Sequence, residues 1–195
     1  MIHLPHFHIK HPLEIPAMIA SFVNVYLAAR TNIWNWFFGA IGVLLYAFIF
    51  YQARLYGDMS LHGVYFLFQI YGFYAWKFGG KNGTELAVRQ LPRYLYVVSL
   101  IIWTALFVLF EVLLSRYTNS TTPVIDAFIT SLSLIAQWMM CKKWIENWFL
   151  WILMDIVSVY MCAYKGLYLT STLYATFLII CCVGYQTWKR ALSKL

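Results

Sequence analysis

One acidic residue lies in the middle of a hydrophobic stretch, and two tryptophans share its face of the predicted helix. The stretch runs from about Ile145 to Ala163, with Asp155 near its centre. Trp148 and Trp151 precede Asp155 by seven and four residues, which places all three on one stripe of an α-helix. A charged group at the centre of a membrane span costs at least about 2.5 kcal/mol, so it usually faces the protein interior or a water-filled cavity. Two indole faces beside a carboxylate form a receptor for a flat organic cation.

Four side-chain amides are further candidates for lining a polar path. Gln69 and Gln137 lie in the middle of hydrophobic stretches, where an amide either contacts a substrate or holds two helices together. Gln52 lies near the end of a stretch, and Asn147 lies at the beginning of another. The candidate substrate-binding residues are therefore Trp148, Trp151, Asp155, Asn147, Gln69, Gln137 and Gln52.

The composition identifies an integral membrane protein. Of the 195 residues, 63% are hydrophobic and only 11% are charged, whereas soluble domains carry about 25% charged residues. The net charge of +7 does not indicate a nucleic-acid partner, because Lys and Arg of membrane proteins collect in cytoplasmic loops. The four cysteines show no CxxC spacing and lie in or at the ends of apolar segments, so we interpret them as small core residues.

Nothing in the sequence indicates an enzyme. The spans lack a nucleophile–base pair or a metal-ligand set, and no GxxxxGK[ST] loop for ATP is present. We therefore expect no catalytic residue, no bound metal and no cofactor. His3, His6, His8 and His11 precede the first hydrophobic stretch, and we interpret them as part of a flexible external tail rather than a metal site.

Seven hydrophobic stretches are long enough to cross a bilayer, which takes about 20 apolar residues. They are approximately 13–30, 33–53, 59–78, 95–115, 124–141, 145–164 and 169–188. With seven crossings, ten Lys and Arg residues fall on one side and four on the other. The positive-inside rule then places the C-terminus in the cytoplasm and the N-terminus outside. Because tryptophans near span ends often form interfacial belts, we expect that role for Trp34, Trp76, Trp144 and Trp188.

The chain contains an internal repeat. Residues 33–77 align with residues 145–189 at a constant offset of 112, without a gap. Ten positions are identical, among them Asn35/Asn147, Trp36/Trp148, Gly72/Gly184 and Trp76/Trp188. The repeated unit is three spans, and the fourth span is a linker that returns the chain to its starting side. Transporters are often built from such parallel repeats, with the substrate held between them near the midplane.

The sequence thus predicts an all-α integral membrane protein with seven transmembrane helices in a 3+1+3 arrangement. We expect one membrane domain over residues 1–195, with a first three-helix repeat at 13–78, a linker helix at 95–115 and a second repeat at 124–188. The repeats differ at the polar positions, because Gly39 and Val43 align with Trp151 and Asp155. We therefore expect an asymmetric site within a symmetric frame.

The motif Trp-x-x-Trp-x-x-x-Asp at residues 148–155, followed by Lys165-Gly-Leu-Tyr168, resembles the PnuC family of vitamin transporters. Asn35-Trp-Phe-Phe-Gly39 and the segments 50–56 and 70–76 are similar to landmarks of that family's first repeat, so the resemblance covers roughly residues 30–190. It implies import of nicotinamide riboside by facilitated diffusion through a bacterial inner membrane, with trapping by cytoplasmic phosphorylation. It is also consistent with a homotrimer.

Two questions about the substrate stay open on the sequence. Relatives in the family carry thiamine, riboflavin or deoxynucleosides, and thiamine, like nicotinamide riboside, contains a cationic ring; a thiamine transporter of the PnuT type is the alternative. A SWEET-type sugar transporter shares the 3+1+3 plan but does not require an anion beside two indoles. Asp155 either neutralises the ligand's charge or hydrogen-bonds its hydroxyl or amide groups.

Overall fold

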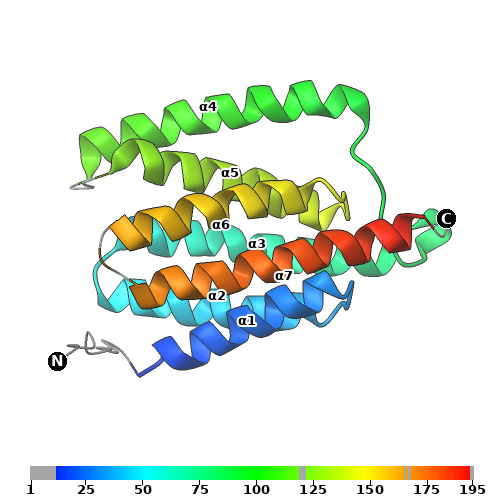
Figure 1. The fold of residues 1–195 in the computed structure, drawn as a ribbon, viewed down its shortest axis with the longest axis horizontal. Helices are drawn as coiled ribbons and strands as arrows, with labels where there is room; N and C mark the ends of the chain where they lie inside the picture. Colours follow the sequence, from blue (N-terminus) through cyan, green and yellow to red (C-terminus); the bar gives the residue numbers. More distant parts are fainter. Residues whose placement is uncertain (1–11, 119–121, 165, 167, 194–195) are drawn as a thin grey trace.

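The computed structural model describes residues 12–118, 122–164, 166 and 168–193, and these form seven α-helices and one short 3₁₀ helix (Figure 1). The elements are α1 (Glu14–Ala29), α2 (Asn35–Gln52), α3 (Tyr56–Phe78), η1 (Lys81–Gly83), α4 (Arg93–Tyr117), α5 (Pro123–Cys141), α6 (Asn147–Tyr164) and α7 (Tyr168–Leu192). Four of them, α2, α4, α5 and α6, are long and apolar enough to cross a membrane, and α1 is a shorter apolar helix. The predicted fold class is confirmed. The N-terminal histidines lie outside the described residues.

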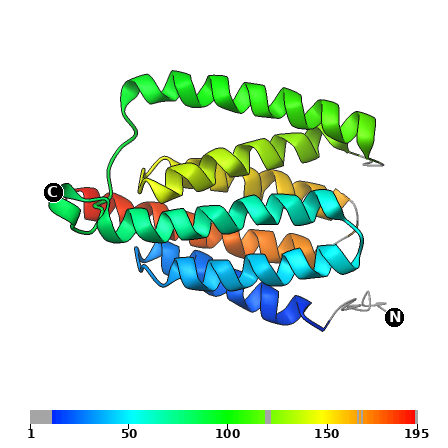
Figure 2. The ribbon, with the colours of Figure 1, turned by 180° about the vertical axis from the view of Figure 1, so that it is seen from behind.

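Successive helices run in opposite directions, so the connections alternate between two ends of the molecule (Figures 1 and 2). Helices α1 and α5 run the same way, which makes the two repeats parallel. The connections 30–34, 79–92 and 142–146 lie at the same end of the molecule as the end of α7, and we call this end the basic end. Its cationic residues are Arg30, Lys77, Lys81, Arg89, Arg93, Lys142, Lys143, Lys189 and Arg190.

Six helices form a closed ring in the order α1, α2, α3, α5, α6, α7, in which each helix packs against the next. Each repeat contributes three consecutive members of this ring. The linker helix α4 packs on the outside of α5, where Trp103 meets Phe128 edge-on at 5.9 Å between ring centroids. Most of its remaining surface is exposed, as expected for a helix that faces lipid.

Reciprocal hydrogen bonds join the two repeats at the basic end. Trp76 Nε1 donates to the carbonyl oxygen of Met140 at 2.9 Å, and Trp188 Nε1 donates to the carbonyl oxygen of Ala28 at 3.0 Å. The offset of 112 residues relates both donors and both acceptors, so one contact is made twice about an approximate two-fold axis.

The same symmetry relates four tryptophans, two from each repeat. We call Trp36, Trp76, Trp148 and Trp188 the tryptophan cluster. Trp36 meets Trp76 edge-on at 5.3 Å, and Trp148 meets Trp188 edge-on at 5.4 Å. Trp76 and Trp188 contact each other across the axis at 5.8 Å. Because all four rings are fully buried, they fill the centre of the ring of helices at the basic end.

The expected interfacial belt is wrong for three of its four tryptophans. Trp76, Trp144 and Trp188 are only 1%, 5% and 0% exposed, whereas Trp34 is 60% exposed. Their helix ends are covered by the opposite repeat and by the 79–92 connection. A position near the end of a span therefore does not place these rings in the lipid interface.

The 79–92 connection lies across the basic end and is fixed there by backbone hydrogen bonds. The Leu86 N–H donates to the carbonyl of Trp76 at 2.9 Å. The Arg89 N–H donates to the carbonyl of Lys143, and the Ile145 N–H donates to the carbonyl of Arg89, both at 3.0 Å. Lys143 is buried, donates from Nζ to the carbonyl of Leu86 at 2.8 Å and lies 4.3 Å from the ring centroid of Trp76. Burial lowers the pKa of Lys143, while the carboxylate of Glu85 partly opposes that shift.

Candidate substrate site

Asp155 lies at the middle of α6 and is 7% exposed. Among the described residues its hydrogen-bond donor is the thiol of Cys181 on α7, with Sγ 3.4 Å from Oδ2. A thiol is a weak donor, so the carboxylate keeps most of its capacity to accept hydrogen bonds or to attract a cation.

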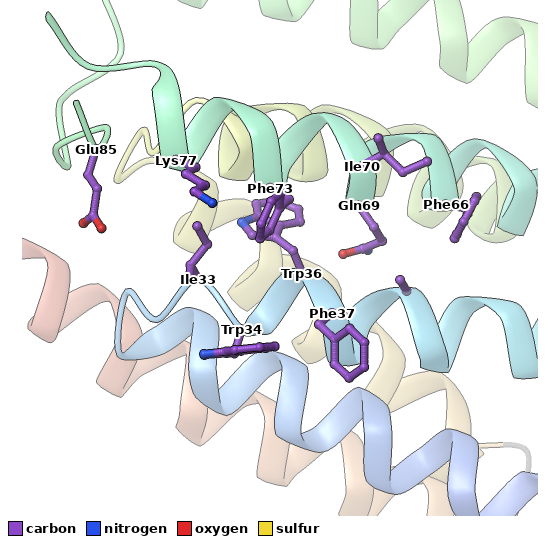
Figure 3. Close-up of a pocket in the computed structure, with 11 residues that line it drawn as sticks. Ile33, Trp34, Trp36, Phe37, Phe66, Gln69, Ile70, Phe73, Lys77 and Glu85 are labelled. Carbon is purple, nitrogen blue, oxygen red and sulfur yellow. The ribbon is translucent and has the colours of Figure 1, made fainter. Parts of the chain in front are cut away.

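Gln69 is a buried polar residue of the first repeat, at the position equivalent to Cys181. Its side chain is 6% exposed, and Oε1 is buried without a hydrogen-bond partner among the described residues. It extends from α3 toward α2 (Figure 3), where a Cβ atom added at Gly39 would collide with the amides of Gln69 and Asn24. Asn24 Nδ2 in turn donates to the carbonyl of Asn35 at 2.7 Å. The absence of a side chain at Gly39 therefore leaves the room that these amides occupy.

The repeat symmetry relates these two polar groups. The offset of 112 aligns Gln69 with Cys181. Gln69 lies about two helical turns before Trp76, and Cys181 lies about two turns before Trp188. These two tryptophans contact each other across the two-fold axis. Residues two turns apart share a helix face. Gln69 and the Asp155–Cys181 pair thus lie at similar depth on the inner side of the ring, above the closed tryptophan cluster.

Trp148 and Asn147 lie within the packing of the basic end. Both are fully buried. The Trp148 ring packs against Gly184 and Trp188, and Asn147 Nδ2 donates to the carbonyl of Trp144 at 2.5 Å. Among the described residues, Trp148 Nε1 and Asn147 Oδ1 have no hydrogen-bond partner, so each retains a polar atom without a protein contact.

The other three predicted residues differ in their surroundings. Trp151 is half-buried, packs against the core and has a buried Nε1 without an acceptor among the described residues. Gln137 is half-buried on α5, the helix that packs against α3 and α6 in the ring. Gln52 is exposed as the last residue of α2, at the end opposite the basic end, so the structure does not bring it to Asp155.

Cys181 is the site residue that the sequence interpretation missed. A cysteine in an apolar run is typically a small buried side chain, and nothing local distinguishes Cys181 from Cys182. The repeat offset contains the missing signal, because it aligns Cys181 with the candidate Gln69.

Comparison with known proteins gives a consistent result. A family model described as nicotinamide mononucleotide transporter matches residues 11–190. The nicotinamide riboside transporter PnuC of Escherichia coli (strain K12) is 30% identical over 203 residues, covering 90% of this chain and 84% of the relative. The riboflavin/roseoflavin transporter RibM of Streptomyces davaonensis is 23% identical over 176 residues, covering 87% and 81%.

The fold is similar to the crystal structure of the vitamin B3 transporter PnuC, with a TM-score of 0.72 and 25% identity over 93% of this chain and 82% of that one. The family and this structural neighbour are transporters and not enzymes, in agreement with the multi-pass membrane character of the chain. Together with the helical repeat and its buried acid, these matches show that the chain belongs to the nicotinamide mononucleotide transporter family, which includes the PnuC transporters.

Proposed function

We propose that the protein imports nicotinamide riboside by facilitated diffusion across a bacterial inner membrane, as a single membrane domain over residues 1–195. The repeats would span 13–78 and 124–188, joined by the linker helix at 95–115. The similarity to the Escherichia coli transporter over most of both chains supports the substrate. We place the basic end in the cytoplasm and the N-terminus outside. Ten Lys and Arg residues of the sequence fall on the side of the basic end, and only Lys10, Arg54, Arg116 and Lys165 fall on the other side.

The observation that carries this proposal is the buried carboxylate of Asp155, whose protein donor is a single weak thiol. Nicotinamide riboside has a cationic pyridinium ring, and a carboxylate in a dry site attracts a cation far more strongly than it does in water. We place the pyridinium beside Asp155, with the indole of Trp151 over one face. Such a cation–π contact contributes up to about 2 kcal/mol when it is desolvated.

The first repeat supplies the complementary polar contact. Gln69 Oε1, which has no protein donor among the described residues, is suited to accept a hydrogen bond from the carboxamide of the ligand. We assign Trp148 and Asn147 to the lower wall of the site, where each keeps an unpaired polar atom. We assign Gln137 to the wall formed by α5 and Gln52 to the outer mouth.

The tryptophan cluster closes the path from this site to the basic end, so release there requires the two repeats to move apart. The reciprocal bonds from Trp76 and Trp188 would break together because they are related by the two-fold axis. No ion gradient is required in this scheme: Asp155 is the only buried carboxylate among the described residues, whereas proton relays use several ionisable groups. We also retain a homotrimer as the expected assembly from the family resemblance.

A binding panel on the purified protein tests the substrate assignment. The ligands are nicotinamide riboside, its reduced dihydropyridine form without the ring charge, thiamine, riboflavin and a deoxynucleoside. We expect nicotinamide riboside to bind most tightly. Preferential thiamine binding would support the PnuT-type alternative. Tight riboflavin binding without affinity for either cation would overturn the role of Asp155 as a partner for a cation, and RibM makes riboflavin a necessary member of the panel.

A further inference from the structure

A groove of about 640 Å³ runs between α2 and α3 of the first repeat (Figure 3). Phe37, Ile70 and Phe73 line it and are exposed, so it opens to the outside of the ring of helices. Its inner wall includes Trp36 and Gln69, which are both buried. Because α2 is long and apolar enough to cross a membrane and α3 packs against it, we expect whatever fills the groove to enter from the bilayer or from another membrane protein.

Two opposite charges lie at the rim of the groove, at the basic end. Lys77 belongs to the last turn of α3, and Glu85 belongs to the 79–92 connection. Neither forms a salt bridge within the described part of the chain. The Lys77 ammonium lies 5.7 Å and 5.3 Å from the ring centroids of Phe73 and Phe78. The rim therefore offers one cation and one anion at the level of the lipid head groups.

Trp36 adds a buried donor just below this rim. It is the second residue of α2, and Lys77 is the second-last residue of α3, so both lie near the same end of their helices. Among the described residues Trp36 Nε1 has no acceptor. A buried donor without a partner is costly in hydrocarbon, where no water replaces the missing acceptor. An acceptor just below the head-group level would satisfy it.

The second repeat is closed at the equivalent place. Phe149 and Tyr185, which align with Phe37 and Phe73, contact each other at 4.8 Å between ring centroids. Phe37 instead packs against Trp34 and Phe38 at 5.8 Å and 5.6 Å. The open groove is thus a feature of one repeat and not a consequence of the shared helical frame.

We propose that this groove is a binding site for a phospholipid whose head group carries a phosphate and a primary ammonium, which is the chemistry of phosphatidylethanolamine. Lys77 binds the phosphate, Glu85 binds the ammonium, and Trp36 Nε1 donates to an ester carbonyl below them. One acyl chain lies over the aromatic rings and covers the outer side of Gln69. Basic pockets between transmembrane helices on the cytoplasmic side commonly bind lipid head groups, and Glu85 selects a zwitterionic head group over a purely anionic one.

Native mass spectrometry of the purified protein tests the proposal with phosphatidylethanolamine, phosphatidylglycerol and phosphatidylcholine, each added separately. We expect one tightly retained phosphatidylethanolamine per chain. Phosphatidylcholine has the same charges, but its quaternary ammonium cannot donate a hydrogen bond to Glu85, so it should bind more weakly. The variants Lys77→Gln and Glu85→Gln should each weaken retention by about tenfold, as expected for a lost charge-assisted contact.

Lys189→Gln is the matched control, because Lys189 aligns with Lys77 in the repeat where the groove is closed. It should retain the lipid as the unaltered protein does, and melting temperatures should confirm that all variants are folded. Equal retention of the three lipids, or equal retention by Lys77→Gln and Lys189→Gln, would overturn the proposal. A change of oligomeric state in Phe37→Ser or Ile70→Ser, without loss of lipid, would instead show a contact between copies. The nicotinamide riboside affinity is measured separately, so failure of this site is distinguishable from failure of the proposed transport function.

Discussion

Residues that differ between the repeats are the residues on which the proposed chemistry depends. At equivalent positions the first repeat has Gly39 and Gln69, whereas the second has Trp151 and Cys181. The small residue leaves space for two amides, and the large indole lies one turn from the only buried carboxylate of the described residues. A substrate between the repeats would therefore meet amides on one side and an acid with an aromatic ring on the other.

Replacing Trp151 by alanine should weaken binding of nicotinamide riboside by roughly 5- to 30-fold, because a desolvated cation–π face is worth about 1–2 kcal/mol. Isothermal titration calorimetry measures the effect. Trp36→Ala is an unsuitable control, since Trp36 is buried against Gly72 and Trp76 and its loss would leave a cavity. Trp103→Ala is the control, because Trp103 lies on α4, outside the ring of helices, and its replacement should leave the affinity unchanged. Equal losses of affinity in Trp151→Ala and Trp103→Ala would show that Trp151 is not part of the site.

Helix packing depends on two glycines, Gly72 and Gly184. At each of them the side chain of a neighbouring helix occupies the space that a Cβ atom would take. A Cβ atom at Gly72 would meet the ring of Trp36, and one at Gly184 would meet the ring of Trp148. These equivalent contacts let α2 approach α3, and α6 approach α7, closely enough for the tryptophan cluster to form. Small residues have this role in many membrane helix pairs.

Alanine at Gly72 or Gly184 should lower the free energy of unfolding by about 1–3 kcal/mol, the usual cost of overpacking a core. Gly63→Ala on the same helix as Gly72 provides the control, because nothing lies within 4 Å of its added Cβ. Denaturation in detergent micelles, monitored by tryptophan fluorescence, measures all three. If Gly63→Ala destabilised the protein as much as Gly72→Ala, the close helix approach would not be the cause.

The reciprocal indole bonds make a second prediction at the scale of the helices. Trp76→Phe and Trp188→Phe should each lower the free energy of unfolding by at least about 1 kcal/mol, through the lost hydrogen bond and the space that the smaller ring leaves in the core. The two losses should be similar because the two contacts are equivalent. The double variant should open the basic end more readily. Labelling of Cys141 or Cys181, which are both buried, by a membrane-permeant thiol reagent should therefore accelerate; unchanged labelling would argue against the tryptophan cluster as a closure.

At the scale of the whole molecule, apolar stretches of about 20 residues are sufficient to predict the seven helices, and the offset of 112 is sufficient to predict the two parallel repeats. Burial at the basic end could not be predicted, because Trp76, Trp144 and Trp188 are covered by parts of the chain distant in sequence. The same non-local packing encloses Trp148, which the sequence placed with Trp151 by helical periodicity alone. Cys181 was not identified because its role depends on contact with Asp155 from another helix.

Transport by the whole molecule should be equilibrative. Protein reconstituted into liposomes should carry nicotinamide riboside down its gradient, and a protonophore should not change the rate, because the described residues contain no second buried carboxylate for a proton relay. Radiolabelled uptake with and without an imposed pH or sodium gradient measures this. Accumulation above the external concentration, driven by either gradient, would contradict the proposed mechanism.

The proposed function depends on recognition of a cationic ring by the buried carboxylate of Asp155. Calorimetric titration of the protein and of Asp155→Asn with nicotinamide riboside and its reduced dihydropyridine form, a neutral ligand without the ring charge, tests it most directly, since asparagine keeps a hydrogen-bonding group of the same size and deletes the charge. We predict that Asp155→Asn loses affinity for the cation at least about tenfold and prefers the cation over the neutral ligand less strongly than the unaltered protein does. An unchanged affinity for the cation, with the same preference over the neutral ligand, would contradict it and leave Asp155 as a hydrogen-bonding residue only.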